Sequence, residues 1–246
     1  DVLLAAVLGA GALADVFVVA LKLPNHFRAI FGEGAFNQAY VPIYARIRTQ
    51  AGEASSALFS NRVFTLLTLV QLALIALVLP GMPVLVSWIA PGFVGDPQRF
   101  DLAVALTRIT FPYLMFITLV TLLAGNLNAI DKFAAAAAAP VLLNVSIIAA
   151  LSVAFLFPTA SHAAAWGVAA AGILEWLLLT VAARRAGVAA ALARPRLDPD
   201  MSAFFRALGP AVIGSAGVQI ALFADTIIAS LLPRGSYAAL YYAERL

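Results

Sequence analysis

Long apolar stretches separated by short polar loops dominate the chain. A helical residue rises about 1.5 Å, so about 20 apolar residues cross a hydrocarbon core roughly 30 Å thick. The pattern predicts five plain spanning helices, over residues 63–88, 102–127, 133–157, 163–183 and 204–232. It also predicts a sixth, interrupted helix over 15–47, the end of a helix over 1–9 and the start of another over 237–246. The pattern therefore indicates an all-α polytopic membrane protein.

Composition supports a bilayer as the solvent of this chain. Hydrophobic residues make up 63% and charged residues 11%, and the mean hydropathy is +0.99, whereas soluble domains carry about 25% charged residues. The sequence contains no cysteine, which excludes disulfides and thiolate metal sites. Its two histidines, His26 and His162, are too few for a histidine-based metal site. The chain begins at Asp1 without a signal-peptide pattern, and we expect its first helix to be truncated.

Lysine and arginine gather in alternate loops, and basic residues are retained on the cytoplasmic side of a membrane. One set of loops holds little besides Arg99 and Arg234. The other set holds Arg46, Arg48, Arg62, Lys132, Arg184, Arg185, Arg194, Arg196 and Arg206. We therefore place the second set in the cytoplasm, and residues 9–14, 91–98, 158–162 and 233–236 outside. This retention signal accounts for the net charge of +3, so the charge does not indicate a nucleic-acid partner.

The chain contains an internal repeat. Residues 1–11 match residues 225–235 at a shift of 224, with an aspartate at each start and a glycine at each end. Six predicted helices separate the copies, and an even number returns the chain to the same side of the membrane. The copies are therefore expected to be parallel repeats related by an axis along the membrane normal. On this basis residues 1–197 form a six-helix N-terminal lobe, and residues 198–246 begin a second lobe with about one and a half helices.

Charged groups within the sixth, interrupted helix are the first candidates for function. A charge at bilayer depth costs at least ~2.5–3.5 kcal/mol on insertion scales, so such groups pair or line a wet cavity. Helical spacing places five polar residues on one stripe: Asp15, Lys22, His26, Glu33 and Asn37. We expect this stripe to be a wet face and the helix to be broken, because it is longer than the membrane requires. A tilted helix whose charges pair with one another, as Lys22 with Asp15, is the structural alternative.

Two arginines fit an anionic ligand. The planar guanidinium gives pyrophosphate two charge-assisted hydrogen bonds and stays ionised at any working pH. Arg28 and Arg245 are the candidates, and anchoring at a helix end is their structural alternative. Asp225 is a candidate cation ligand, or alternatively an interfacial carboxylate.

Other polar residues lie within the predicted helices. Arg108 and Glu175 interrupt apolar stretches. Asn126, Asn128 and Asn144 are expected to make hydrogen bonds between helices, which is the commoner role of amides in helix bundles.

Several ordered motifs resemble one known family. They are Asp1, Gly9-Ala-Gly11, Ala14-Asp15, Lys22-Leu-Pro-Asn25, Arg28, Phe31-Gly-Glu-Gly-Ala-Phe36, Gln38-Ala, Val41-Pro42, Thr110-Phe-Pro-Tyr113, Pro140-Val-Leu-Leu-Asn144, Leu208-Gly-Pro210 and Tyr241-Tyr-Ala-Glu-Arg-Leu246. Together they span essentially the whole chain. The set resembles the MurJ/MviN family, the lipid II flippases of bacterial peptidoglycan synthesis.

The resemblance implies the fold of the MOP superfamily, which includes multidrug exporters of the MATE type and has two six-helix lobes facing a central cavity. This chain would be the first lobe and the start of the second. Arg28 and Arg245 would be cavity arginines that engage the pyrophosphate of lipid II, and their acidic partners would be Asp1, Asp15 and Glu244. Lys22, Asn25 and Glu33 complete the predicted substrate-binding set. Asp225 matches a position that supplies a sodium ligand in some members, whose other ligands would lie beyond Leu246.

The resemblance further implies a multi-pass protein of the bacterial inner membrane that moves lipid II by alternating access, without catalysis and without a cofactor other than sodium. Its expected partners are lipid II, membrane lipids and cell-wall synthesis proteins. The family's arginine before Asp1 and its late helices are not in this sequence, so this piece alone is not expected to flip lipid. A related exporter of another lipid-linked oligosaccharide or a drug is one alternative. A membrane enzyme acting on polyprenyl phosphates is another, although the acidic residues are dispersed and only His26 lies near them.

Overall fold

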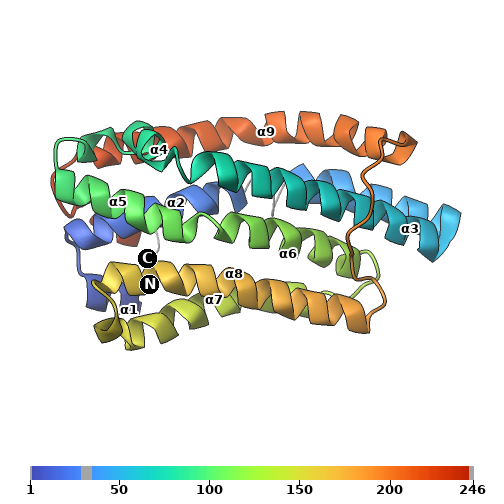
Figure 1. Cartoon of the computed structure of the whole chain (residues 1–246), viewed down its shortest axis with the longest axis horizontal. Helices are drawn as coiled ribbons and strands as arrows, with labels where there is room; N and C mark the ends of the chain where they lie inside the picture. Colours follow the sequence, from blue (N-terminus) through green and yellow to red (C-terminus); the bar gives the residue numbers. More distant parts are fainter. Residues whose placement is uncertain (1, 29–34, 244–246) are drawn as a thin grey trace.

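The computed structural model describes residues 2–28 and 35–243, and in this part it contains helices and no strand. The helices are α1 (Val2–Leu8), α2 (Ala12–Arg28), α3 (Ala35–Val78), α4 (Met82–Ile89), α5 (Pro97–Thr110), α6 (Tyr113–Asn128), α7 (Ala134–Ser152), α8 (Ala160–Arg185), α9 (Pro199–Ser230) and α10 (Ser236–Ala243), with 3-10 turns at Pro91–Phe93 and Ala154–Leu156. Figure 1 shows a bundle in which α9, α3, α6, α8 and α7 follow one another as neighbours. The prediction of an all-α bundle is confirmed.

Four helical segments of the described chain are long and apolar enough to cross a membrane. They are Ala35–Val78, Pro97–Asn128, Ala134–Ser152 and Ala160–Arg185. The predicted window 204–232 coincides with most of α9, which runs from Pro199 to Ser230. Of the interrupted helix expected over 15–47, the structure describes α2 up to Arg28 and α3 from Ala35, and the predicted break between them lies outside the described residues.

Helix α3 is a hairpin of two helical arms rather than one rod. Gly52 between the arms has a φ of 85°, a backbone conformation that glycine adopts without steric cost. Tyr40 in the first arm stacks on Phe59 in the second, with ring centroids 5.6 Å apart. The turn at Gly52 therefore returns the chain across the bundle, at the end that carries Arg46, Arg48 and Arg62.

The linker between α8 and α9 crosses the same end of the bundle. The side-chain oxygen of Asn61 accepts a hydrogen bond from the backbone N–H of Ala191 (2.8 Å), and that of Thr65 accepts one from Ala193 (2.8 Å). Asp198 then caps α9 by accepting from the N–H of Met201 (2.8 Å). These contacts attach an otherwise extended segment to α3.

Two ion pairs fix the start of α9 to α3. Asp198 pairs with Arg62, and Asp200 pairs with Arg46 at 2.9 Å. We call these two pairs the cytoplasmic clamp, because they lie at the end where the basic loops gather. Through this clamp α9, the first helix of the predicted second lobe, begins in contact with the first lobe.

A buried amide connects the linker to the bundle interior. Asn126 is fully buried in α6 and accepts a hydrogen bond from the Tyr40 hydroxyl at 2.6 Å. Its amide nitrogen donates to the Ser60 hydroxyl (2.8 Å) and to the carbonyl of Val188 (2.9 Å). The predicted interhelical role of Asn126 is confirmed. The same prediction is wrong for Asn144, which is exposed and donates to the carbonyl of Pro140 in its own helix, at 3.4 Å.

Replacing Asn126 by alanine is expected to lower the free energy of unfolding by about 1–3 kcal/mol. The substitution leaves the buried hydroxyls of Tyr40 and Ser60 without their amide partner. The measurement is the thermal unfolding midpoint of the full-length protein in detergent. Asn144→Ala is the matched control and should change stability by less than about 0.5 kcal/mol. Equal effects of the two substitutions would contradict the assigned role of Asn126.

Candidate functional site

A fully buried carboxylate, that of Asp15 in α2, organises the end of the bundle opposite the basic loops, which the loop charges predict to be the outer end. Its side chain has 0% exposure and pairs with Arg99 of α5, with Nη2 and Oδ2 3.0 Å apart. Arg99 is itself only 8% exposed, and its guanidinium lies 4.1 Å from the ring centroid of Phe93. An ion pair this far from water is stable only with further hydrogen bonds.

Helix α10 supplies those further bonds to Asp15. The backbone N–H of Gly235 donates to Oδ2 at 2.7 Å, and that of Ala238 donates to Oδ1 at 2.8 Å. Both groups lie at the start of α10, where the first N–H groups of a helix have no partner within the helix. Asp15 therefore caps a helix that lies more than 200 residues further along the chain, and its negative charge also complements the helix dipole.

A second ion pair lies next to the first at the same end. Asp96 caps α5 by accepting from the backbone N–H of Arg99 (3.4 Å), and it also pairs with Arg234 in the loop before α10. Desolvation acts to raise the pKa of Asp96, but the hydrogen bonds from Arg99 and Arg234 lower it more, so the pKa lies below its ordinary value. The ion pair of Asp96 with Arg234 therefore stabilises the folded protein fully at any pH above the ordinary carboxyl pKa. This stabilisation is lost only as the pH falls through the lowered pKa of Asp96.

We call these four residues, Asp15, Arg99, Asp96 and Arg234, the outer latch. They join α2 and α5 of the first predicted lobe to the loop and helix that follow α9. The glycine-bearing segments of the internal repeat also meet here. Gly235 has a φ of 89°, and a methyl group at this position would overlap the carbonyl of Ala10. Next to the latch, two distant segments of the main chain are thus in direct contact, at Ala10 and Gly235.

Two residues of the predicted polar stripe, Asp15 and Lys22, share a face of α2 that α10 covers. The His26 side chain and Glu33 lie outside the described part, and Asn37 lies in α3. Lys22 is two turns beyond Asp15 on the same face, and its Nζ lies 5.1 Å from the ring centroid of Tyr237 in α10. The expectation that Asp15 faces water is wrong for this conformation, because its carboxylate is buried against α10. Asn25 is partly exposed on the next turn of α2.

Several predicted substrate-binding residues lie outside the described residues. They are Asp1, Glu33, Glu244 and Arg245, and for Arg28 and His26 only the backbone, in the last turn of α2, is described. Their predicted roles stay predictions. Asp225, the predicted sodium ligand, is exposed on α9. Within residues 2–28 and 35–243 no group of three or more His, Cys, Asp or Glu residues gathers, so the described side chains alone do not form a site for Asp225 to complete.

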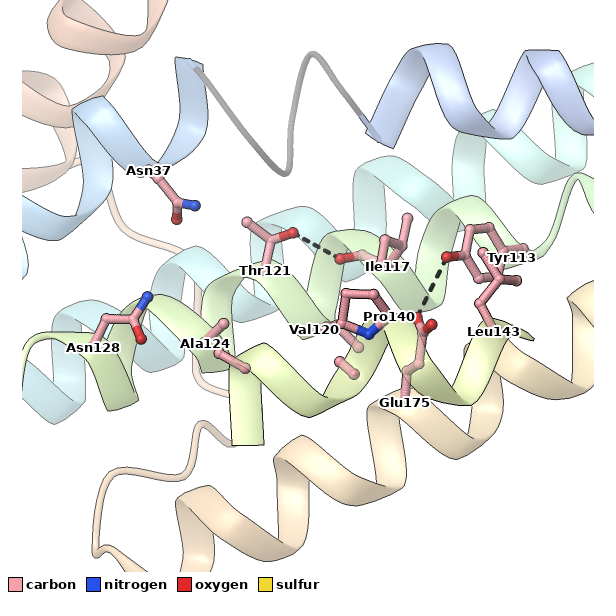
Figure 2. A pocket seen from close by; sticks show the side chains of 12 residues that line it. Asn37, Tyr113, Ile117, Val120, Thr121, Ala124, Asn128, Pro140, Leu143 and Glu175 are labelled. Atoms are coloured by element: carbon pink, nitrogen blue, oxygen red, sulfur yellow. Dashed lines mark hydrogen bonds between the residues drawn. The ribbon is translucent and has the colours of Figure 1, made fainter. Parts of the chain in front are cut away.

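A polar groove lies deeper in the bundle, between α6, α7, α8 and the first turn of α3 (Figure 2). We call it the α6–α8 groove. Its volume is about 210 Å³. Glu175 of α8 is 1% exposed and accepts a hydrogen bond from the Tyr113 hydroxyl at 3.4 Å. Asn128 lies at the other end of the groove, and Thr121 lies between them.

Two of these functional residues carried a weak signal in the sequence. Arg99 was predicted only as an outer-loop residue, although Asp96 followed by Pro97 is typical of a helix start and places Arg99 in the first turn of that helix. Glu175 is the one acidic residue in the apolar stretch 163–183, which marks a buried carboxylate but not its neighbours. Their partners Asp15 and Tyr113 are more than 60 positions away, and a sequence pattern does not reveal such contacts.

Comparison with known proteins agrees with this architecture. The sequence profile of the family described as "Lipid II flippase MurJ" matches residues 4–246. The chain is 40% identical to the "Probable lipid II flippase MurJ" of Rhizobium tropici over 251 residues, which cover 100% of this chain and 47% of that protein. It is 35% identical to the "Lipid II flippase MurJ" of Burkholderia cenocepacia, covering 100% of this chain and 49% of the relative.

The chain thus spans about half the length of the curated relatives that it matches. The match nevertheless extends over almost all of its residues, including those of the outer latch and the α6–α8 groove. This chain therefore belongs to the MurJ family.

Proposed function

We propose that the full-length protein moves lipid II, the polyprenyl-diphosphate-linked precursor of peptidoglycan, from the inner to the outer leaflet of the bacterial cytoplasmic membrane. The whole-chain family match carries this proposal, because the matching family is described as a lipid II flippase, and two relatives are described as a probable lipid II flippase and a lipid II flippase. The four membrane-length helices support a transporter that acts within the bilayer. Binding and release of an unchanged substrate require no catalytic group.

The proposed substrate site engages the diphosphate through arginines. Arg28 and Arg245 provide bidentate donors for phosphate oxygens, and Lys22 and Asn25 lie on α2 before Arg28. We assign acidic partner roles to Asp1, Glu33 and Glu244, and Asp15 would join them once it is released from the latch. A sodium ion at Asp225, with further ligands from the rest of the protein, and association with cell-wall synthesis proteins are proposed from the resemblance.

The outer latch gives the proposed cycle a closed outer face. Its residues connect the first lobe to the start of the second at the outer end, and the cytoplasmic clamp connects them at the other end. In the proposed cycle this arrangement belongs to a state that is closed to the outside. Opening toward the outside would require Asp15 to leave Arg99 and the N-terminus of α10. Rocking of one lobe against the other, as in transporters built from repeats, would separate these groups while the cytoplasmic clamp keeps α9 on α3. The membrane potential acts on cavity charges at ~2.3 kcal/mol per charge per 100 mV and is a candidate driving force.

Replacing Arg28 by alanine in the full-length protein is expected to abolish flipping, because the diphosphate loses its bidentate partner. Arg28→Lys should retain only part of the activity, since an ammonium group lacks the planar fork. The measurement is transfer of fluorescent lipid II across reconstituted vesicles. Arg206→Ala is the control, because Arg206 is exposed and donates only to Ser202 of its own helix at 3.3 Å. Flipping by Arg28→Ala at the rate of the control would refute the proposed site.

Replacing Asp15 by alanine is expected to open the outer face. Removing one partner of a buried ion pair typically costs about 3–5 kcal/mol, and α10 also loses its cap. Ala238 has 0% exposure beneath the latch, so a cysteine introduced there reports on opening. Its labelling rate with a membrane-impermeant thiol reagent, in full-length protein without other reactive cysteines, should rise roughly tenfold or more.

Asp101→Ala is the matched control for this experiment. Asp101 is an exposed carboxylate of α5 near the same end of the bundle, and its removal should leave the labelling rate unchanged. An unchanged rate in Asp15→Ala would show that the carboxylate does not hold the outer face closed.

A further inference from the structure

The α6–α8 groove runs from the cytoplasmic end of the bundle toward its middle. Asn128 is the last residue of α6, at the end that carries the basic loops, whereas Glu175 lies near the middle of α8. Figure 2 shows these two side chains at opposite ends of the groove, with Thr121 between them and Asn37 of α3 directed toward it from the other side. The groove therefore places separate polar groups along the first lobe, with apolar side chains between them.

Several polar groups of the groove offer hydrogen-bond acceptors. The buried Oδ1 of Asn128 has no hydrogen-bond partner among the described residues. The Thr121 hydroxyl donates to the carbonyl of Ile117 at 2.9 Å, which leaves its own lone pairs available. Pro140 cannot donate to the carbonyl of Ala136, four residues earlier in α7, because proline has no N–H, and both residues line the groove.

The charge of the groove differs from that expected for a diphosphate site. Glu175 contributes a carboxyl group, and the described lining includes neither lysine nor arginine. Acceptors and a carboxylate favour ligand groups that donate through O–H or N–H, and they disfavour a phosphate. Apolar side chains such as Ile117, Val120 and Leu143 form the remaining walls, which suits a ligand that carries methyl or ring C–H groups beside its polar ones.

The size of the groove limits what it can hold. Its volume of about 210 Å³ is below the roughly 300–1,000 Å³ typical of pockets for drug-sized ligands. A whole sugar–peptide headgroup does not fit, but a single sugar ring with its substituents is of the right order.

The end of the groove near Glu175 lies at the same depth in the bundle as the backbone of Arg28. The Ser161 hydroxyl of α8 donates to the carbonyl of Leu13 in α2 at 2.9 Å, so these two residues share a level. Both helices contact each other and start at the outer end. Fifteen residues further, about 22 Å along each axis, α2 reaches the backbone of Arg28 and α8 reaches Trp176, next to Glu175.

Resting on the proposed function, we propose that the α6–α8 groove binds one amide- and hydroxyl-bearing sugar of the headgroup, while the diphosphate is bound at the level of Arg28. Asn128, Thr121 and Glu175 are the specificity-determining residues of this subsite. A headgroup that enters from the cytoplasm then extends from the diphosphate back along the groove toward the cytoplasmic surface. The subsite distinguishes the complete substrate from a polyprenyl diphosphate without sugars.

The test compares two probes on the full-length protein in nanodiscs: polyprenyl diphosphate with its sugar–peptide headgroup, and bare polyprenyl diphosphate. The measured quantity is the ratio of their dissociation constants for the wild type and for Asn128→Leu, Thr121→Val and Glu175→Gln. Each variant is expected to reduce the preference for the headgroup by about fivefold or more, since it removes a hydrogen-bonding group from the site. Binding of the bare lipid should stay at the wild-type value, and it also reports that each variant is folded.

Asn144→Leu is the matched control, because this exposed asparagine of α7 lies outside the groove, and its preference should equal that of the wild type. The inference is overturned if the wild type binds both probes equally or if Asn128→Leu and Thr121→Val keep the full preference. These two variants decide the outcome if Glu175→Gln does not fold. Failure of the wild type to bind either probe would instead contradict the proposed function itself.

Discussion

One constraint explains the arrangement of the outer end: a buried carboxylate must be paired with an opposite charge and with hydrogen-bond donors. Asp15 has no exposed side-chain surface, and an ionised group taken from water without partners costs far more than one interaction returns. Arg99 supplies the opposite charge, and the N-terminus of α10 supplies two main-chain donors. Asp15 is thus paired by the other two partners at once. The contact between the predicted lobes combines this buried charge with the apolar packing of Tyr237, Ala238 and Tyr241 of α10 in the core cluster of the first lobe.

The two ends of the bundle differ in the kind of contact that they use. At the cytoplasmic end the clamp of Arg62 with Asp198 and Arg46 with Asp200 is partly exposed, and exposed pairs contribute little individually. The linker hydrogen bonds and the aromatic contacts of Phe204 with Phe36 and Phe59 add to it. At the outer end the connection combines the buried latch with the packing of Tyr237, Ala238 and Tyr241 in the apolar core. This asymmetry agrees with a molecule that pivots near one end and opens at the other.

The sequence predicted much of the fold because membrane helices have a strong signature. Apolar length identified the spanning segments, and the basic loops identified the shared end at which the linker and the turn of α3 lie. The common face of Asp15 and Lys22 also followed from helical spacing. The covering of that face by α10 could not be predicted, since α10 lies more than 200 residues away along the chain and no local pattern encodes such a contact. The amides show the same limit: Asn126 and Asn144 lie in similar apolar surroundings, and only tertiary packing determines that one connects helices and the other does not.

The path of the linker between α8 and α9 is imposed from outside, by the side chains of Asn61 and Thr65 acting on its main-chain N–H groups. Leu192 and Leu197 of this segment are 73% and 80% exposed, so these side chains contribute little to its course, whereas Val188 is buried and Gly187 has a φ of 71°. The exposed part of the linker therefore tolerates substitution, except by proline at 191 and 193, where the N–H is needed. Its length, by contrast, is strictly constrained, because one inserted or deleted residue would shift the capping residue of α9 relative to Arg62. Natural variation in this linker should therefore appear as exchange of side chains at constant spacing.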